Sequence, residues 1–498
     1  MDSLISALHS IGIFLMVLMI FNLMIVVHEW GHFLAARWRN LKIDAFQIWF
    51  GKPIWKKTIN GVQYGLGTIP FGGFVKLPQM VTMEAIEGKN GEPGETLPPI
   101  SPLDKIIVAF AGPLFSFLLA VTFACLVAYF GKPEYEADAS KQIGYIVKDS
   151  PAEKAGLKPG DDVISIDDKP VRSYSGVVDS IKWMVVSSEG SQIKFQIVRP
   201  GEGPKTIEVE AKKPEVDPNL SFFKKLVTRP PFRMVGIGPA FPIMVSDFMP
   251  NKKNTPAQQA GFEKGDRLVS INGTKLYSPF QLGDYLAETN ALNKPQELEV
   301  IRHEKTIKLT ITPRIPDEKS TDWNLKDEAL ETLGLQFDFK GQRAHSHPSV
   351  FAQINDAART ISQTLKSITS PKSDLSAQHL SSVVGIVHTY TSLLNDPEGI
   401  LLVLWFSVVL NVNLAILNLL PFPVLDGGHI VMALVEAIRR RPMNLRILEY
   451  VQATFVVLLL GLMVLLTMKD TGDLFGASQK VKDGKQPEPK NEVISSFK

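Results

Sequence analysis

His28-Glu29-Trp30-Gly31-His32 ends an apolar segment that runs from Ile11 to Val27, and this combination decides the fold class. On a helix the two histidines, four residues apart, share one face, so both can bind one divalent metal ion. Glu29 follows the first histidine, from where its carboxylate can accept a proton from an attacking water. The pattern also arises by chance at helix ends, but ionisable groups that end an apolar span are costly and usually functional. We therefore predict that His28 and His32 bind Zn²⁺.

Three further segments are apolar and long enough to cross about 30 Å of hydrocarbon, which takes roughly 20 residues. They run from Ile106 to Phe130, from Ile400 to Leu425 and from Tyr450 to Met468. The first segment is not typical of a signal peptide, because residues 1–10 contain no Lys or Arg and no small-residue cleavage site follows. The sequence predicts a polytopic α-helical membrane protein with four transmembrane helices.

Basic residues at the ends of these segments predict the orientation of the chain in the bilayer. They follow the first segment, precede the second, and lie between the third and fourth: Arg37, Arg39, Lys42, Lys105, Arg439, Arg440, Arg441 and Arg446. We expect these loops to be cytoplasmic, in the inner membrane of a Gram-negative cell. The insert between the second and third segments then lies in the periplasm. The first and third segments run in the same direction and end at the cytoplasmic face.

A catalytic zinc site has three protein ligands and one open position, so a third ligand is required. The third segment ends in Asn418-Leu-Leu-Pro-Phe-Pro-Val-Leu-Asp426-Gly-Gly-His429. Asp426 is our predicted third ligand, at a depth similar to that of the two histidines. The prolines and glycines also fit a simple helix stop. Both interpretations can hold, because an unwound backbone lets a short aspartate reach a metal.

The composition excludes two other classes of site, one for nucleic acids and one built from cysteines. Lys and Arg number 53 against 51 Asp and Glu, for a net charge of +2, and we find no nucleic-acid motif, so we predict no nucleic-acid binding. The one cysteine, Cys125, can form neither an internal disulfide nor a Cys-rich zinc cluster.

The insert contains an internal repeat. Ser150-Pro-Ala-Glu-Lys-Ala-Gly156 recurs 105 positions later as Thr255-Pro-Ala-Gln-Gln-Ala-Gly261, and each copy continues into a Gly-Asp turn and an apolar strand. Ser or Thr before Pro predicts a helix N-cap, and Gly predicts its end. Two copies of one α+β module are therefore expected between the second and third membrane segments.

These motifs closely resemble the bacterial site-2 proteases of the regulator of sigma-E protease type: His28 to His32 on the first helix, Asn418 to Gly428 on the third, and two PDZ-like repeats between the second and third. The resemblance implies an intramembrane zinc metalloprotease with Zn²⁺ held by His28, His32 and Asp426, and with Glu29 as the catalytic acid/base.

The resemblance also suggests substrate-binding residues. Asn413 and Asn418 are candidates for holding the substrate backbone. Between Phe46 and Leu77, alternating runs with Gly-rich turns predict hairpins. In the family this region is a membrane-associated β-hairpin that pairs with substrate, which makes Gly72 and Gly73 candidates as well. A small solvent-facing β-meander is the alternative.

Two residues depart from the family pattern. Ser116 stands where relatives usually have Asn, and Trp49 stands where Gly is common. We expect neither residue to touch the ligands, so that only the fine packing of the second helix and the shape of the loop after the first helix are affected.

By this resemblance the substrates are single-pass membrane proteins, such as pre-trimmed anti-sigma factors or remnant signal peptides, cut within the bilayer. The PDZ domains can bind a peptide or a C-terminal tail, or act as a size filter. One alternative is a PDZ scaffold or pseudoprotease that never cuts, against which the intact Glu29 argues. Another is a metal transporter, which leaves the repeats, Pro421 and Pro423 unexplained.

The predicted organisation assigns every part of the chain. It comprises transmembrane helix 1 (1–45), the β-hairpin region with a cytoplasmic loop (46–104), transmembrane helix 2 (105–131), PDZ 1 (132–230), PDZ 2 (231–316), a linker (317–398), transmembrane helix 3 (399–428), a cytoplasmic loop (429–448), transmembrane helix 4 (449–468) and a disordered tail (469–498). Within the linker, apolar residues from Val350 to Ile368 predict a surface helix on the membrane or against the PDZ pair. His345 and His347 are expected to be solvated rather than metal ligands.

Overall fold

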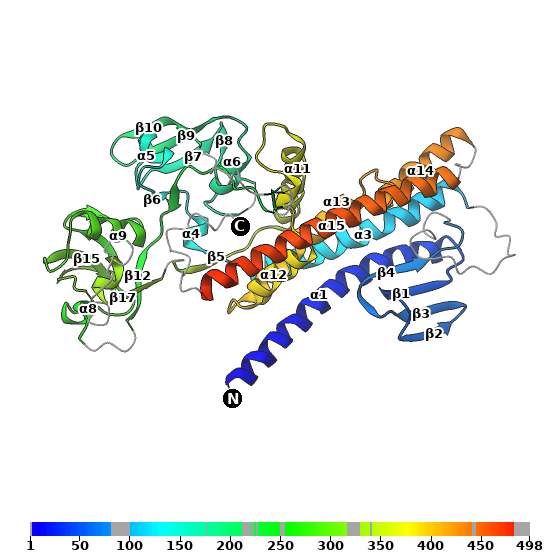
Figure 1. The fold of residues 1–498 in the computed structure, drawn as a ribbon, viewed down its shortest axis with the longest axis horizontal. Helices are drawn as coiled ribbons and strands as arrows, with labels where there is room; N and C mark the ends of the chain where they lie inside the picture. The colour runs from blue at the N-terminus through cyan, green and yellow to red at the C-terminus, as the bar shows by residue number, and fades with distance from the viewer. Residues whose placement is uncertain are drawn as a thin grey trace. The chain divides into compact units, whose positions relative to one another are not determined.

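The computed structural model describes residues 2–80, 100–176, 178–211, 221, 224–225, 228–249, 254–315, 329–338, 341–440 and 445–482 (Figure 1). The chain divides into two compact units. We call Met1–Lys132, His347–Ser362 and Leu380–Thr471 the transmembrane unit, and Pro133–Ser346, Gln363–His379 and Gly472–Lys498 the β unit.

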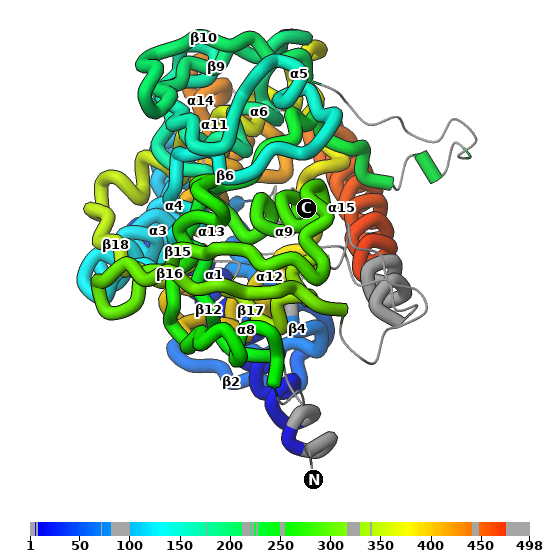
Figure 2. Tube along the Cα trace, turned by 90° about the vertical axis from the view of Figure 1, so that its left-hand side faces the viewer, coloured from blue at the N-terminus to red at the C-terminus, as the bar shows by residue number. Residues whose placement is uncertain are grey.

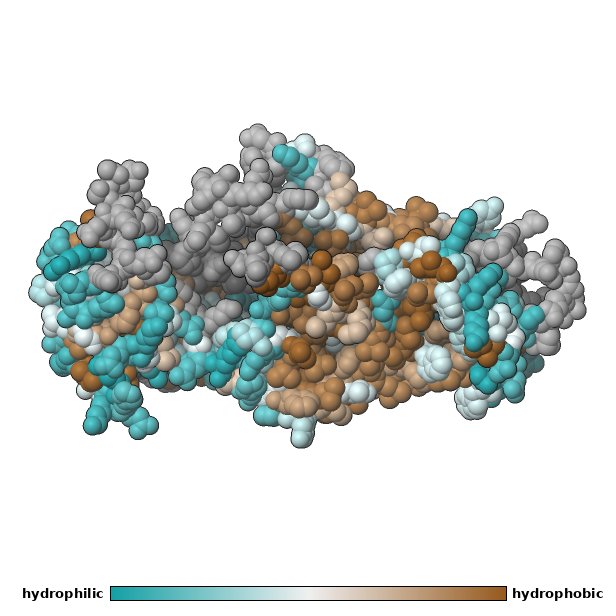
Figure 3. Space-filling model, turned by 90° about the horizontal axis from the view of Figure 1, so that it is seen from below, coloured by the Kyte–Doolittle hydropathy of each residue, from teal (hydrophilic) through white to brown (hydrophobic). Residues whose placement is uncertain are grey.

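Four helices are long and apolar enough to cross a membrane, as the sequence predicts: α1 (Asp2–Trp38), α3 (Pro102–Phe130), α13 (Gly399–Asn418) and α15 (Leu445–Lys482). The shortest of them, α13, has 20 residues. At about 1.5 Å per residue this length matches the roughly 30 Å of hydrocarbon. Hydrophobic residues gather over this unit on the face drawn in Figure 3, as expected for a surface in contact with lipid tails.

Helix α3 packs against both α1 and α13. Gly31 of α1 lies so close to α3 that a Cβ there would be 2.4 Å from the carbonyl oxygen of Ala111. Small residues permit such close helix approach inside a membrane, where packing rather than the hydrophobic effect drives association. On the other side, Phe123 and Ala124 share a core with Val408 of α13. The end of α1 that carries the His28 to His32 motif is thereby held against α3.

Two helices of this unit were not predicted, α12 (Val383–Leu394) and α14 (Asp426–Arg439). The interpretation of residues 429–448 as a loop is therefore wrong as far as Arg439. The glycine pair after Asp426 indicated a helix end, whereas both glycines lie in the first turn of α14. Helix α14 packs on α3, where the Lys105 ammonium donates to the Glu436 carboxylate in an ion pair of 2.6 Å.

The chain after Met468 continues as helix, so the prediction of disorder is wrong for residues 469–482, and residues 483–498 lie outside the described part. Lys469 and Asp470 signalled the end of the span, but both are buried. The Asp470 carboxylate accepts hydrogen bonds of 2.7 Å from the backbone N–H and the hydroxyl of Ser382, and the Lys469 ammonium donates to the Leu380 carbonyl at 2.6 Å. Charges paired in this way do not require water around them.

Helix α11 (Val350–Thr369) confirms the predicted helix, and its last part contacts the β unit, the second of the two predicted placements. Its buried Ala357 lies in one core with residues of α3 and α13, and the Gln353 amide donates to the Ala124 carbonyl at 2.9 Å. The last part of α11 belongs to the β unit, where the Trp183 indole N–H donates to Gln363 at 3.0 Å. The apolar spacing predicted a buried face but could not indicate which elements cover it.

A four-stranded sheet follows α1, with strand order β2-β3-β1-β4: β1 (Ala45–Phe50), β2 (Trp55–Ile59), β3 (Val62–Leu66) and β4 (Ile69–Lys76). Strands β1 and β3 are parallel and the other pairs are antiparallel. Asn60 and Gly61 both have positive φ, as the predicted two-residue turn requires. Phe46 and Val75 of the sheet share a core with Phe33 of α1 and Val108 of α3. The sheet is therefore fixed to the helices and is not a free meander.

The β unit contains two modules, each with its own core. The first has the sheet β10-β9-β7-β8 and the pair β11-β6, and the second has the order β16-β15-β13-β12-β17, with β14 beside β13. Figure 2 labels β9 and β10 of the first module and β15 and β16 of the second. The second core also includes Leu333, Leu335 and Phe337, which lie beyond residue 316. The elements are β5 (Lys132–Tyr135), α4 (Glu136–Ala139), β6 (Ile143–Ile146), α5 (Pro151–Ala155), β7 (Asp162–Ile166), β8 (Lys169–Pro170), α6 (Ile181–Ser187), β9 (Gln192–Arg199), β10 (Gly203–Glu210), β11 (Ile237–Pro239), β12 (Ile243–Phe248), α8 (Pro256–Gln259), β13 (Arg267–Ile271), β14 (Thr274–Lys275), α9 (Pro279–Glu288), β15 (Gln296–Arg302), β16 (Lys305–Ile311), η1 (Ala329–Leu333), β17 (Leu335–Asp338), β18 (Arg343–Ser346) and η2 (Ala377–His379).

The internal repeat is visible in both modules. The Ser150 and Thr255 side chains cap α5 and α8, as predicted. Each copy also has an ion pair with a buried aspartate that the repeat motif did not include: Arg199 with Asp161 and Arg302 with Asp266, both at 2.7 Å. Each arginine also donates to the carbonyl of the glycine that follows the short helix. The pair thus joins the end of the helix to the sheet in both modules.

Replacing Asp266 with Asn is expected to destabilise the second module by about 1.5–3 kcal/mol, because the partly buried Arg302 guanidinium loses its buried counter-charge and keeps only the exposed carboxylate of Glu263. Burial opposes ionisation of Asp266, but hydrogen bonds from Arg302 outweigh it and lower the pKa of this carboxyl. The pKa of Asp266 is lower in the folded chain than in the unfolded chain. Its contribution to the free energy of unfolding is therefore complete at neutral pH and is lost as the pH falls through the lowered pKa. Unfolding of the full chain is monitored by proteolysis of the β unit at pH values between 7 and 3. This measures both the loss of stability and its dependence on pH.

Asp247→Asn is the matched control, because Asp247 pairs with Lys264 at an exposed site of the same module. Exposed pairs contribute little to stability, because water and salt screen them. Equal losses of stability in the two variants would contradict the structural role of the buried pair.

Candidate metal centre

Three side chains that are distant in sequence lie together in the transmembrane unit. One nitrogen or oxygen of each of His28, His32 and Asp426 lies within 4.8 Å of the others, and all three side chains are largely buried. The Nε2 atoms of the two histidines are 3.3 Å apart, and each is 3.3–3.4 Å from an oxygen of Asp426. The structure therefore brings the three predicted ligands to one point.

The other ring nitrogen of each histidine is held by α3. His32 Nδ1 lies 2.8 Å from the carbonyl oxygen of Val108, to which it donates, and this leaves the lone pair of Nε2 facing Asp426. His28 Nδ1 lies 3.0 Å from the hydroxyl of Ser116. Such outer partners fix the tautomer and the ring orientation of a metal-binding histidine. The expectation that Ser116 does not touch the ligands is wrong, because α3 packs directly along the face of α1 that carries the histidines.

Gly112 of α3 leaves the space in which the two imidazoles meet. A Cβ at this position would lie 2.2 Å from His32 Nε2 and 2.9 Å from His28 Cε1. Any side chain here would occupy the volume in front of the donor atoms. Sequence reasoning missed Gly112, because a glycine within an apolar span is equally compatible with ordinary helix packing.

Asp426 is the first residue of α14, not the unwound end of the preceding helix as the sequence predicted. Helix α13 ends at Asn418, and the loop with Pro421 and Pro423 separates the two helices. Gly427 and Gly428 let α14 start close to this loop: a Cβ on either would lie 2.1–2.2 Å from a loop carbonyl oxygen. The break between the helices, with the glycine pair, places the short Asp426 side chain at the histidines.

Helix α15 supports this loop. The amide of the buried Gln452 donates to the Pro423 carbonyl at 3.1 Å, and the ring of Phe455 lies 5.8 Å from that of Phe422. These contacts lie three and four residues before Asp426. The one sequence signal for Gln452 is a polar residue within an apolar span.

Glu29 is half-buried and lies beside strand β4. A Cβ on Gly73 would be 3.3 Å from Glu29 Cγ, so the backbone of β4 runs directly against this side chain. Gly72 is placed differently, since its φ is +75° and a Cβ there would lie inside the ring of Phe50. Of the two predicted glycines, the structure brings Gly73 to Glu29 and places Gly72 under Phe50.

Asn413 and Asn418 both lie on α13. The Asn413 side-chain oxygen is buried and has no hydrogen-bond partner in the part of the chain that the structure describes. Within the described residues, neither asparagine is hydrogen-bonded to His28, His32 or Asp426. Both asparagines therefore remain candidates for binding substrate, and neither belongs to the cluster of His28, His32 and Asp426.

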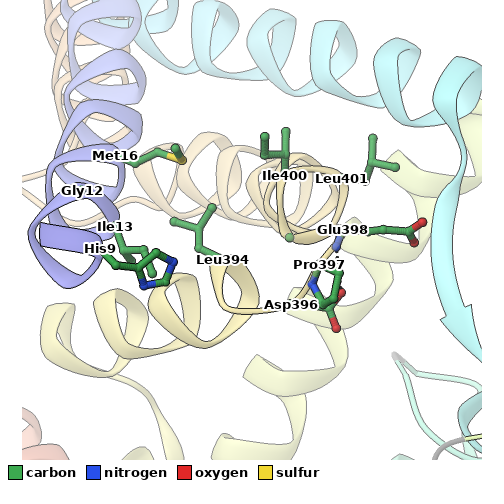
Figure 4. Close-up of a pocket in the computed structure, with 11 residues that line it drawn as sticks. His9, Gly12, Ile13, Met16, Leu394, Asp396, Pro397, Glu398, Ile400 and Leu401 are labelled. Atoms are coloured by element: carbon green, nitrogen blue, oxygen red, sulfur yellow. Dashed lines mark hydrogen bonds between the residues drawn. The ribbon is translucent and has the colours of Figure 1, made fainter. Parts of the chain in front are cut away.

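A pocket of about 480 Å³ lies elsewhere in this unit, between the start of α1 and the junction of α12 and α13 (Figure 4). Ile13, Met16 and Leu394 make most of its wall apolar, and Figure 4 shows Glu398 extending away from His9. Met16 precedes His28 by 12 residues, about 18 Å along α1 at 1.5 Å per residue, so this pocket is not the metal centre.

The cluster fits a catalytic zinc ion by the chemistry of its donors. Two imidazoles and one carboxylate are a known ligand set for catalytic zinc, and three protein ligands leave the fourth position open. Glu29 is next to the cluster but is not one of its three members.

Residues 15–462 match peptidase family M50. The chain is 28% identical over 473 residues to protease RseP of Yersinia pestis, covering 92% of this chain and 98% of that protein. It is 26% identical over 481 residues to the regulator of sigma-E protease RseP of Salmonella typhimurium, covering 92% and 98%. For the regulator of sigma-E protease RseP of Escherichia coli K12 the identity is 25% over 458 residues, covering 89% and 95%.

Proposed function

This chain belongs to peptidase family M50 and is a zinc metalloprotease, and from that premise we propose that it cuts the transmembrane segments of single-pass membrane proteins. One observation carries the proposal: the donor atoms of His28, His32 and Asp426 converge where a helix long enough to cross the bilayer ends. By similarity, its substrates are proteins such as pre-trimmed anti-sigma factors or remnant signal peptides.

In this proposal His28, His32 and Asp426 hold the zinc, which when bound acts as a Lewis acid toward the scissile carbonyl. Ser116 and the Val108 carbonyl keep the two imidazoles oriented for binding. Glu29 accepts a proton from the attacking water and returns it to the leaving amine. No described residue hydrogen-bonds to the Glu29 carboxylate, so both of its oxygens remain available for this transfer.

Strand β4 is the element that presents the substrate backbone. It pairs with β1 along one edge, and its other edge is unpaired among the described strands. An extended peptide can add to such an edge through main-chain hydrogen bonds. Because Gly73 lies against Glu29, a substrate strand paired with β4 would have its peptide bonds near the carboxylate. Asn413 and Asn418 are proposed to hold the substrate backbone, and Gly72 is proposed to set the backbone conformation of β4.

The orientation follows from the basic residues at the helix ends. We place the metal centre toward the cytoplasmic side of the inner membrane, and the β unit with both chain termini in the periplasm. The β unit is proposed to consist of two PDZ domains, a reading that its repeated short helix, Gly-Asp turn and antiparallel sheets favour. These domains would bind a peptide or a C-terminal tail, or exclude substrates with bulky external domains.

Zinc removal tests the proposal directly. The protein is reconstituted with a single-pass model substrate, zinc is stripped with a membrane-permeant chelator, and cleavage is followed by gel and mass spectrometry. We expect cleavage to stop and to return with Zn²⁺ but not with Mg²⁺, because nitrogen ligands suit zinc and Mg²⁺ prefers an all-oxygen shell.

Each other outcome identifies a competing function. Cleavage that continues after complete zinc removal would disprove the metalloprotease. A zinc-loaded protein that binds the model substrate and never cuts it would favour a scaffold, and zinc-dependent metal flux without cleavage would favour a transporter.

A further inference from the structure

Trp49 has an unusual backbone conformation. It lies within β1 with a φ of +69°, at the point between Ile48 and Phe50 where the pairing of β1 with β4 changes register. A bulky residue with positive φ is a true outlier, and such conformations persist only where surrounding contacts enforce them. The contacts around Trp49 therefore indicate the role of this strained residue.

One set of contacts holds the backbone of this bulge. The buried Gln47 side chain donates to the carbonyl oxygens of Trp49 and Gly51, each at 3.0 Å. Gly67 leaves room for the same segment, since a Cβ there would be 2.5 Å from the Trp49 carbonyl oxygen. These contacts keep the bulge rigid and determine where the indole ring points.

The indole is bound to the transmembrane helix. Its N–H donates to the side-chain oxygen of Asn22 on α1, and the Asn22 amide donates to the Leu18 carbonyl at 2.7 Å. Asn22 is the one hydrogen-bonding side chain in the apolar segment from Ile11 to Val27. A polar group in such a segment is costly unless it has a partner, and Trp49 provides that partner.

Asn22 and Glu29 are seven residues apart and so lie on the same face of α1. Ile25 lies between them, and a Cβ on Gly73 of β4 would be 3.3 Å from both Ile25 Cγ2 and Glu29 Cγ. Gly73 is paired with Ile48, the neighbour of Trp49. Figure 1 shows β1 and β4 along the final part of α1. The indole bond thus fixes the sheet on the helix about two turns before Glu29.

We propose that Trp49 and Asn22 are positioning residues for the peptidase, whose hydrogen bond holds the Gly73 segment of β4 in register with Glu29. Among the described residues, neither of the two is hydrogen-bonded to the three metal donors or to Glu29, so we assign their effect to the position of β4. The inference rests on the proposed function, because it requires Glu29 as the proton carrier and β4 as the strand that presents substrate.

The test is a double-mutant cycle in the full-length, membrane-reconstituted protein. Trp49→Phe removes the N–H and keeps an aromatic ring, and Asn22→Leu removes the acceptor with little change of volume. Zinc content, kcat, KM and the position of the cut are measured with the single-pass model substrate. Trp55→Phe is the matched control, because Trp55 lies in the outer strand β2 of the same sheet and its indole has no hydrogen bond to any described residue.

Each single variant is expected to lower kcat about tenfold, as the loss of one hydrogen bond predicts. The double variant should also lose about tenfold, since both changes remove the same bond. KM should stay within about twofold, because a transmembrane substrate obtains most of its affinity from the bilayer and its other contacts. Zinc content should be unchanged, and cuts at neighbouring peptide bonds should appear, because β4 no longer fixes the register. Trp55→Phe should match the wild type.

A Trp49→Phe enzyme with wild-type kcat and a single cut position would overturn the inference. So would losses that multiply to about a hundredfold in the double variant, since independent effects add in free energy. Loss of zinc together with activity would mean that the pair only maintains the fold. Failure of the proposed function would look different, because the wild-type enzyme would then cleave after complete zinc removal or would not cleave at all, whatever happens at Trp49.

Discussion

Replacing Glu29 with Gln is expected to lower kcat by about 10²- to 10⁴-fold, the range in which general acid–base groups contribute. Gln has nearly the same shape as Glu, so the packing of the side chain against Gly73 is retained. It has no ionisable oxygen and therefore cannot accept the proton of the attacking water. The measurement is the single-turnover rate on a model single-pass substrate, with the zinc content determined on the same sample.

The zinc content distinguishes a role of Glu29 in proton transfer from a role in binding the metal. Glu29 is not one of the three clustered donor residues, so the Gln variant should keep its zinc. Glu297→Gln serves as a control, because this glutamate forms an exposed ion pair with Lys308 in the β unit. If the Glu29 variant cleaves at the wild-type rate, another group carries the proton. If it loses zinc, Glu29 belongs to the metal site.

Features that depend on local sequence were the predictable ones. Apolar length predicted four spanning helices, and the spacing of the repeat predicted the caps at Ser150 and Thr255. The His28 to His32 motif and the aspartate before the glycine pair pointed to donors that the structure brings together. In each case the residues that form one helix, one cap or one motif are contiguous in the chain.

Features that depend on which helices touch were not predictable. The sequence cannot show that α3 lies along the histidine face of α1, and so the contacts of Ser116, Val108 and Gly112 were missed. Helix α14 was interpreted as a loop because its first turn contains two glycines, residues that weaken an isolated helix. Packing against α3 overrides that weakness. Trp49 stood out as a departure, but its bond to Asn22 joins residues 27 positions apart.

Replacing Gly112 with Ala should abolish zinc binding, although it adds a single methyl group outside the donor set. The new Cβ would lie 2.2 Å from His32 Nε2 and 2.5 Å from His32 Cε1. His32 cannot move away easily, because its Nδ1 is bound to the Val108 carbonyl. Helix α3 cannot retreat without losing the contact between Gly31 and Ala111. Removing an outer partner of a metal ligand lowers affinity about 10- to 100-fold, and obstructing the donor atom itself should lower it by more.

Gly461→Ala is the matched control for this change, since Gly461 also lies in a membrane-spanning helix and a Cβ there meets nothing within 4 Å. It should leave zinc affinity unaltered, and as an exposed Gly-to-Ala change in a helix it should stabilise α15 slightly. Competition with a chromophoric chelator measures the zinc affinity of both variants, and thermal unfolding shows whether they remain folded. A folded Gly112→Ala protein with wild-type zinc affinity would mean that the imidazoles do not converge in front of α3. In that case the positions of all three donors, and with them the role assigned to Asp426, would have to be abandoned together, because the same contact of α3 with α1 orients both histidines toward that carboxylate.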